Sequence, residues 1–140
     1  MRTFVPYDIQ GEAHILAAYT CTPLVKIPVA QLQPGAQVKG TTVAELGNRN
    51  RPLDMIVYQK DGKDYLLMAN NARGLMKIPT EGIDRIEGIT QRVPDKAGLK
   101  YETVAGIKGV EQLDLFDKDH ALVLIRTGDG TRNLETVELP

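Results

Sequence analysis

The chain has 140 residues, enough for one domain with a sizeable hydrophobic core. Hydrophobic residues make up 42% and charged residues 25%, which excludes wholesale disorder, collagen and coiled coils. The net charge of -1 and the absence of tryptophan argue against nucleic-acid binding, because neither a basic field nor many base-stacking aromatic residues are available. No apolar run approaches the roughly 18 residues of a membrane span.

Short apolar runs between turn residues predict strands along the whole chain. The first group of predicted strands is Thr3–Ile9, Ala13–Thr20, Pro23–Pro28 and Gln37–Leu46. The second is Leu53–Gln59, Asp64–Asn70, Arg73–Pro79 and Leu99–Ile107. The third is Gly109–Phe116, Asp119–Thr127 and Thr131–Leu139. Residues 81–98 are predicted to be an insertion with one short turn of helix. No segment shows a sustained helical period, so we expect an all-β protein.

The predicted strand groups are related by an internal repeat. Residues 14–28 align with residues 65–79 without a gap at a spacing of 51, with identity at Leu16/Leu67, Ala18/Ala69, Leu24/Leu75, Lys26/Lys77, Ile27/Ile78 and Pro28/Pro79. A second match relates Thr42–Leu46 to Thr103–Ile107, and a third relates the Asp8 and His14 region to Asp114 and His120 at a spacing of 106. The sequence therefore predicts about three copies of one four-stranded unit, at residues 3–46, 47–107 and 108–140.

Four short antiparallel strands in a repeat of this length are typical of a β-propeller blade. The arrangement resembles the broad group of NHL, YVTN and gluconolactonase-like propellers. Because propellers close with four to eight blades, three copies imply either part of a larger propeller or a dimeric ring of three blades plus three. The expected partners are therefore a second copy or the remaining blades of a longer chain. A β-sandwich or β-barrel is the alternative fold.

Three aspartates near the first strand of each unit are candidate metal ligands: Asp8, Asp54 and Asp114. In a propeller this strand lines the central channel, so the three carboxylates would converge on a cation, and Ca²⁺ prefers such oxygen ligands. Gluconolactonase-like enzymes hold a metal at such a place, so the resemblance also implies Ca²⁺ as a possible cofactor. The alternative is that each aspartate caps a tight turn or accepts a hydrogen bond from a neighbouring backbone N–H.

A polar loop between the first two copies is the candidate ligand-binding site. It contains Asn48, Arg49, Asn50 and Arg51 and leads into Asp54. Two arginines could bind a carboxylate or phosphate through their forked donors. The corresponding loop of the third copy has no such residues, which favours an individual function over a repeated structural role. An ordinary solvated loop is the alternative.

The leading functional hypothesis is a non-catalytic module that binds a ligand or partner, or acts as a scaffold. The alternatives are a Ca²⁺-dependent hydrolase or lactonase of gluconolactonase type and the propeller part of a periplasmic redox enzyme. Cys21 is the single cysteine, so no disulfide can form within the chain. The sequence does not indicate a cellular compartment. A periplasmic or secreted location is expected only if the chain belongs to a longer precursor.

Overall fold

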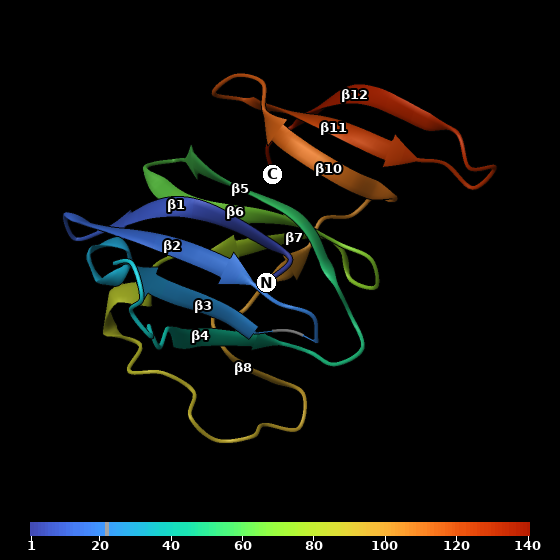
Figure 1. Ribbon diagram of the computed structural model, residues 1–140. Coiled ribbons are helices and arrows are strands. Elements are labelled where there is room, and N and C mark those ends of the chain that lie inside the picture. Colours follow the sequence, from blue (N-terminus) through green and yellow to red (C-terminus); the bar gives the residue numbers. More distant parts are fainter. Residues whose placement is uncertain (22) are drawn as a thin grey trace.

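The computed structural model describes residues 1–21 and 23–140, and its regular secondary structure is almost entirely antiparallel strand (Figure 1). The all-β prediction is confirmed. Among the described residues the strands form three sheets, none of which closes on itself. This part of the chain contains no helix that is long and apolar enough to cross a bilayer.

The three sheets are built mainly from consecutive strands, and a later short strand, at residues 96–98, returns to join the first sheet. Sheet A contains β1 (Thr3–Ile9), β2 (Glu12–Ala18), β3 (Pro23–Pro28), β4 (Thr41–Leu46) and β8 (Lys96–Gly98), in that order. Sheet B contains β5 (Pro52–Lys60), β6 (Lys63–Asn70), β7 (Gly74–Pro79) and β9 (Glu102–Thr103). Sheet C contains β10 (Val110–Leu115), β11 (His120–Arg126) and β12 (Arg132–Glu138). Two short 3-10 helices, η1 (Val29–Gln31) and η2 (Ile83–Arg85), follow β3 and β7.

The sequence repeat corresponds to two hairpins of identical register. His14 lies opposite Pro28 in the β2–β3 pair, and Tyr65 lies opposite Pro79 in the β6–β7 pair. The first strands agree as well, because Thr3 pairs with Ala18 while Asp54 pairs with Ala69. A spacing of 51 therefore relates β1–β3 to β5–β7 residue by residue.

The third sheet does not follow the spacing of 106 that the sequence suggested. Tyr7 pairs with His14 in sheet A, but Leu113 pairs with Val123, three residues beyond His120. A better reference is the β-bulge near the start of the first strand, which occurs between Pro52 and Asp54 in β5 and between Val110 and Gln112 in β10. Aligning the two bulges gives a spacing of 58 between β5 and β10.

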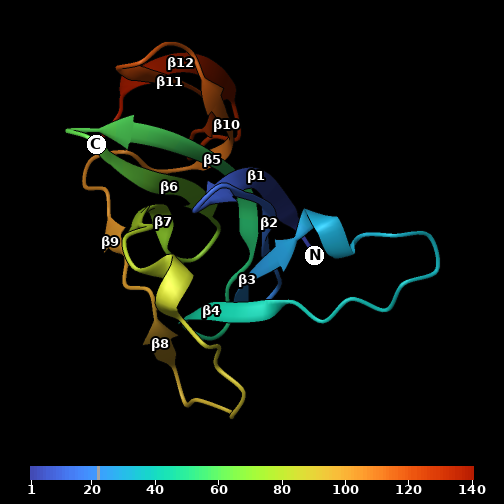
Figure 2. The ribbon, with the colours of Figure 1, turned by 90° about the vertical axis from the view of Figure 1, so that its left-hand side faces the viewer.

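The sheets pack face to face, as layers with sheet B in the middle. One hydrophobic core lies between sheets A and B, and a second lies between sheets B and C. Strand β5 contacts both β1 and β10, and Figure 2 shows β5 and β6 between sheet C and the strands of sheet A. The layered arrangement is sandwich-like, and each layer covers the apolar face of its neighbour.

Two of the predicted strands are much longer than the strands that the structure contains. The strand predicted at residues 37–46 begins only at Thr41, and the strand predicted at residues 99–107 is reduced to Glu102–Thr103. The insertion contains the expected short helical turn, η2, but its end forms β8, which pairs with β4 of sheet A. Glycine permits this pairing, because Gly98 has a φ of 73° and a side chain there would overlap the carbonyl oxygen of Val43.

Candidate functional site

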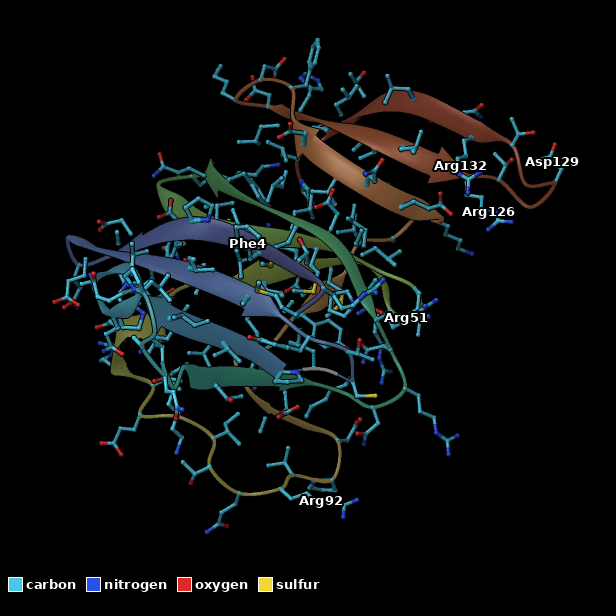
Figure 3. All side chains as sticks on the ribbon, in the orientation of Figure 1. Phe4, Arg51, Arg92, Arg126, Asp129 and Arg132 are labelled. Carbon is cyan, nitrogen blue, oxygen red and sulfur yellow. The ribbon has the colours of Figure 1, made fainter. Side chains whose placement is uncertain are left out.

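The face of sheet A that points away from sheet B is apolar, with its β1 side exposed and its β3 side partly covered by the chain at Gly40. Side chains alternate between the two faces of a strand, and the cross-strand pairs place six residues in two rows on this face. They are Phe4, Ala17 and Val25, and Pro6, Ile15 and Ile27. Phe4, which Figure 3 labels on β1, is 55% exposed, while Ala17 is buried among its neighbours. Sheet A therefore ends the stack with an apolar surface.

The same positions in sheet B are buried against sheet A. Adding 51 to each of the six residue numbers gives Met55, Met68 and Met76, and Val57, Leu66 and Ile78. All six pack in the core between sheets A and B. The outer face of sheet A is thus the repeat equivalent of a face that, in sheet B, is covered by another sheet.

Sheet C ends the stack on the other side, also with apolar residues. Ala121 and Val123 face sheet B, so Leu122 and Leu124 lie on the outer face, and Leu134 pairs with Leu124 on that same face. Leu134 is 66% exposed. Charged residues surround this apolar centre, including Glu111, which forms ion pairs with Arg126 and Arg132. We call this surface the C face and the surface on sheet A the A face.

An aromatic residue near the end of each first strand points towards the next layer. In sheet A the hydroxyl of Tyr7 donates to Oδ2 of Asp64 at 3.1 Å and lies 2.9 Å from Oγ1 of Thr80, both on sheet B or directly after it. In sheet B the equivalent residue at a spacing of 51 is Tyr58, whose hydroxyl donates to the carbonyl oxygen of Pro140 at 2.6 Å, directly after sheet C. These two contacts tie each layer to the following one.

In sheet C the equivalent aromatic residue has no layer to contact. The bulge alignment places Phe116 at the position of Tyr58, since both follow their bulge by the same number of residues. The side chain of Phe116 is 62% exposed. Phe116 directly follows β10, lines the cleft where the hairpin ends of sheets B and C meet, and lies at the edge of the C face.

The surroundings of the Tyr7 and Tyr58 hydroxyls raise the pKa of both groups. Burial raises the pKa of Tyr58, and the nearby Tyr65 and Glu102 raise it further. Burial also raises the pKa of Tyr7, and although the hydrogen bond with Thr80 opposes this, the Asp64 carboxylate adds to the rise. Both groups are therefore neutral donors at physiological pH.

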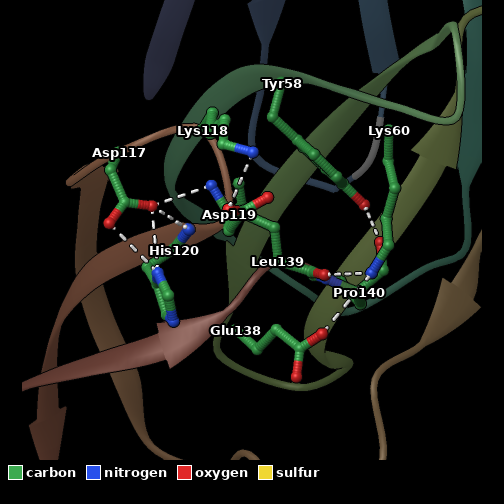
Figure 4. A network of polar contacts seen from close by, with 9 residues as sticks. All are labelled: Tyr58, Lys60, Asp117, Lys118, Asp119, His120, Glu138, Leu139 and Pro140. Carbon is green, nitrogen blue, oxygen red and sulfur yellow. Dashed lines mark hydrogen bonds and ion pairs between the residues drawn. The ribbon is translucent and has the colours of Figure 1, made fainter.

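A cleft of about 710 Å³ lies where the hairpin ends of sheets B and C meet. Figure 4 shows its polar contacts: Nζ of Lys60 donates to the carbonyl oxygen of Leu139 at 2.6 Å, and Asp117 caps the β10–β11 turn. Asp117 also lies 2.9 Å from Nδ1 of His120. Hydrogen bonds from the Asp119 backbone and the His120 side chain lower the pKa of Asp117. The contact between Lys60 and Leu139 attaches the C-terminal residues to β5, and the contacts of Asp117 stabilise the β10–β11 turn.

The three candidate metal-binding aspartates have different hydrogen-bond partners. Asp8 Oδ1 accepts from the N–H of Gly11 in the β1–β2 turn, and Asp114 accepts from the N–H of Leu115. Asp54 Oδ1 accepts from the N–H of Met55, and its Oδ2 accepts from the N–H of Leu113 in sheet C. Their predicted equivalence is wrong, because the hairpin registers align Asp54 with Thr3 in sheet A and with Gln112 in sheet C.

The polar loop before β5 divides into buried and exposed residues. Asn50 is 2% exposed, donates to the carbonyl oxygen of Gly47 and accepts from Nδ2 of Asn70 at 2.8 Å. Asn48 donates to the carbonyl oxygen of Pro94 at 2.6 Å. Arg49 and Arg51 are exposed, and Figure 3 shows Arg51 near the start of β5. Asn50 is thus an internal residue, whereas Asn48, Arg49 and Arg51 are exposed to solvent.

Among the described residues, no group of three or more histidine, cysteine, aspartate or glutamate side chains is arranged to hold a metal ion. Comparisons of the chain with models of protein families, with curated proteins and with solved structures gave no match.

The A face and the C face were not predicted from the sequence as candidate sites. Alternation within the strands and the spacing of 51 together identify the A face, because they map Phe4 onto Met55 and Ala17 onto Met68. The C face carries no comparable signal, since its register could only be obtained from the observed bulge.

Proposed function

We propose that this protein is a non-catalytic partner-binding and scaffold module built from propeller-type blades, which binds its partner through the open faces of its outer sheets. The single observation that carries the proposal is the A face, whose six positions are covered by a neighbouring sheet when they occur in sheet B. A partner that lays a β-sheet on this face would remove the same kind of surface from water.

Two further features support this proposal. Exposed apolar patches of this kind mark interaction surfaces in soluble proteins. The layers also stack in a constant direction. In sheet B, the face formed by Met55, Met68 and Met76 lies against the preceding sheet, and the face that carries Tyr58 lies against the next sheet. Blades of a propeller are arranged in this way around their axis.

Site-specific photo-crosslinking tests the proposal. A benzoylphenylalanine residue is introduced at Phe4 on the A face or at Leu134 on the C face, and at Lys118 as a control. Lys118 occupies a hairpin tip where its side chain is 88% exposed. The full chain is then irradiated in the cells that produce it, and the products are identified by mass spectrometry.

The proposal predicts crosslinks to one defined polypeptide from both faces and none from position 118. Equal crosslinking from the faces and from the hairpin tip would contradict it, and so would no crosslink from either face.

A further inference from the structure

We infer that the partner is a second copy of this chain, whose A face covers the C face of the first copy and whose C face covers the A face in return. The inference rests on the proposed function and names the occupant of both open faces. The dimer would need no new kind of interface, because sheet C of one copy would pack on sheet A of the other as sheet A packs on sheet B, and sheet B on sheet C, within one chain.

The direction of the layers selects a head-to-tail arrangement. Within the chain, the face of sheet B equivalent to the A face lies against the sheet that precedes it. The next layer after sheet C must therefore present a surface equivalent to the A face. A second copy offers this surface at its first sheet, with Phe4, Ala17 and Val25 in one row.

The aromatic contacts between layers predict which residues would meet. Tyr7 contacts Asp64 and Thr80, and subtracting 51 from these two numbers gives Ala13 in β2 and Val29 directly after β3. Phe116, at the corresponding aromatic position of sheet C, would therefore contact Ala13 and Val29 of the second copy.

The aromatic residue and its contact residues are all polar between sheets A and B, and all apolar at the expected contact between sheet C and a second copy. Tyr7 has a hydroxyl, and its partners on sheet B are a carboxylate and a hydroxyl. Phe116 has no hydroxyl, and its expected partners Ala13 and Val29 are apolar. Val29 is 40% exposed and Phe116 is 62% exposed, so both are available for the contact. This matched loss of polarity favours the chain itself as the partner.

Two copies would bring six sheets together. Six lies within the range of four to eight blades over which propellers close, and a twofold axis would make the two new interfaces identical. The net charge of -1 gives little repulsion between copies.

Charge substitutions on the two faces provide the test, and they alter exposed positions so that folding is preserved. The C-face variant carries Phe116→Lys and Leu134→Lys, and the A-face variant carries Phe4→Glu and Val29→Glu. Leu115→Lys is the control, because Leu115 is the neighbour of Phe116, is 47% exposed and points to the opposite side of the strand. Circular dichroism checks the fold, and sedimentation velocity measures the molar mass.

Each face variant alone is expected to sediment as a 15.4 kDa monomer, and the Leu115→Lys control as a dimer. An equimolar mixture of the two face variants is expected to regain the dimer, because one interface is then unchanged and the other pairs lysine with glutamate. A face variant that still dimerises alone would overturn the head-to-tail arrangement. Monomeric wild-type protein, or photo-crosslinks from both faces to a different polypeptide, would overturn the second copy as occupant, and the latter result would leave the proposed function intact.

Discussion

Oδ2 of Asp54 in β5 accepts a hydrogen bond of 3.0 Å from the backbone N–H of Leu113 in β10. Sheet C thereby uses a side chain of sheet B to satisfy a backbone donor on the edge of its first strand, which would otherwise lack a partner. The other oxygen of the same carboxylate accepts from the N–H of Met55. One aspartate therefore joins two layers of the stack.

Replacing Asp54 by alanine should lower the free energy of unfolding by about 1–3 kcal/mol, because it leaves the half-buried N–H of Leu113 without an acceptor. Asp114→Ala is the matched control, since Asp114 is exposed and, among the described residues, accepts a hydrogen bond from the adjacent Leu115 alone. We expect the control to change stability by less than about 0.5 kcal/mol. Urea unfolding measures both variants, and equal losses would contradict a bridging role for Asp54.

Gly98 and Gly62 separate backbone strain from steric overlap, because both have a φ of 73°. Alanine at position 62 meets no atom within 4 Å, so we expect only the cost of an unfavourable φ, about 1 kcal/mol. Alanine at position 98 would also overlap the Val43 carbonyl oxygen and should cost more by separating β8 from β4. Hydrogen exchange at the Leu99 N–H, which bonds to that oxygen, should accelerate in Gly98→Ala alone.

Asn50 and Arg51 should respond differently to alanine, although they are neighbours in one polar loop. Asn50→Ala removes a buried amide that binds Gly47 and Asn70, so we expect a loss of about 1–3 kcal/mol. Arg51→Ala truncates an exposed side chain and should leave stability within about 0.5 kcal/mol of the wild type. Chemical unfolding of both variants tests this, and a stable Asn50→Ala protein would refute the buried role of the asparagine.

Alkaline pH should weaken the attachment of sheet C to sheet B. An unfolded tyrosine has a pKa of about 10, and burial raises the pKa of Tyr58 above that value. The resulting stability is complete below about pH 10 and is lost as the pH rises through the folded pKa of Tyr58. We therefore expect the free energy of unfolding to fall above about pH 10, and to fall less steeply in Tyr58→Phe.

The Tyr58→Phe variant also tests the hydrogen bond to Pro140. At pH 8 its loss should cost about 1 kcal/mol. Tyr19→Phe serves as the control, because the described residues provide no hydrogen bond to the Tyr19 hydroxyl. If both variants showed the same alkaline transition, Tyr58 would not be its source.

The sequence predicted the hairpins well, because each was defined by local information. Alternating apolar residues and the Asp61-Gly62 turn specify β5 and β6. The repeat aligned residues 14–28 with residues 65–79, and the structure gives the two hairpins that contain them the same register. Local strand pairing needs only residues that are close in the chain, so periodicity is sufficient there.

Long-range pairing was not predictable in the same way. The short strand at residues 96–98 pairs with β4, about fifty residues earlier, through a single glycine that permits close approach. The supposed match of Asp8 with Asp114 failed because residues 116–119 connect β10 to β11, whereas only residues 10–11 connect β1 to β2, and the longer connection changes the register of sheet C. The buried role of Asn50 likewise depends on Asn70, which joins it only after folding.

The molar mass of the wild-type chain, measured by light scattering over a range of concentrations, shows whether two copies cover each other's open faces. The open A and C faces predict that the mass rises with concentration to twice the 15.4 kDa of one chain and stops there, because the second copy closes the stack. A mass of 15.4 kDa at every concentration would contradict the account, and so would growth beyond two copies.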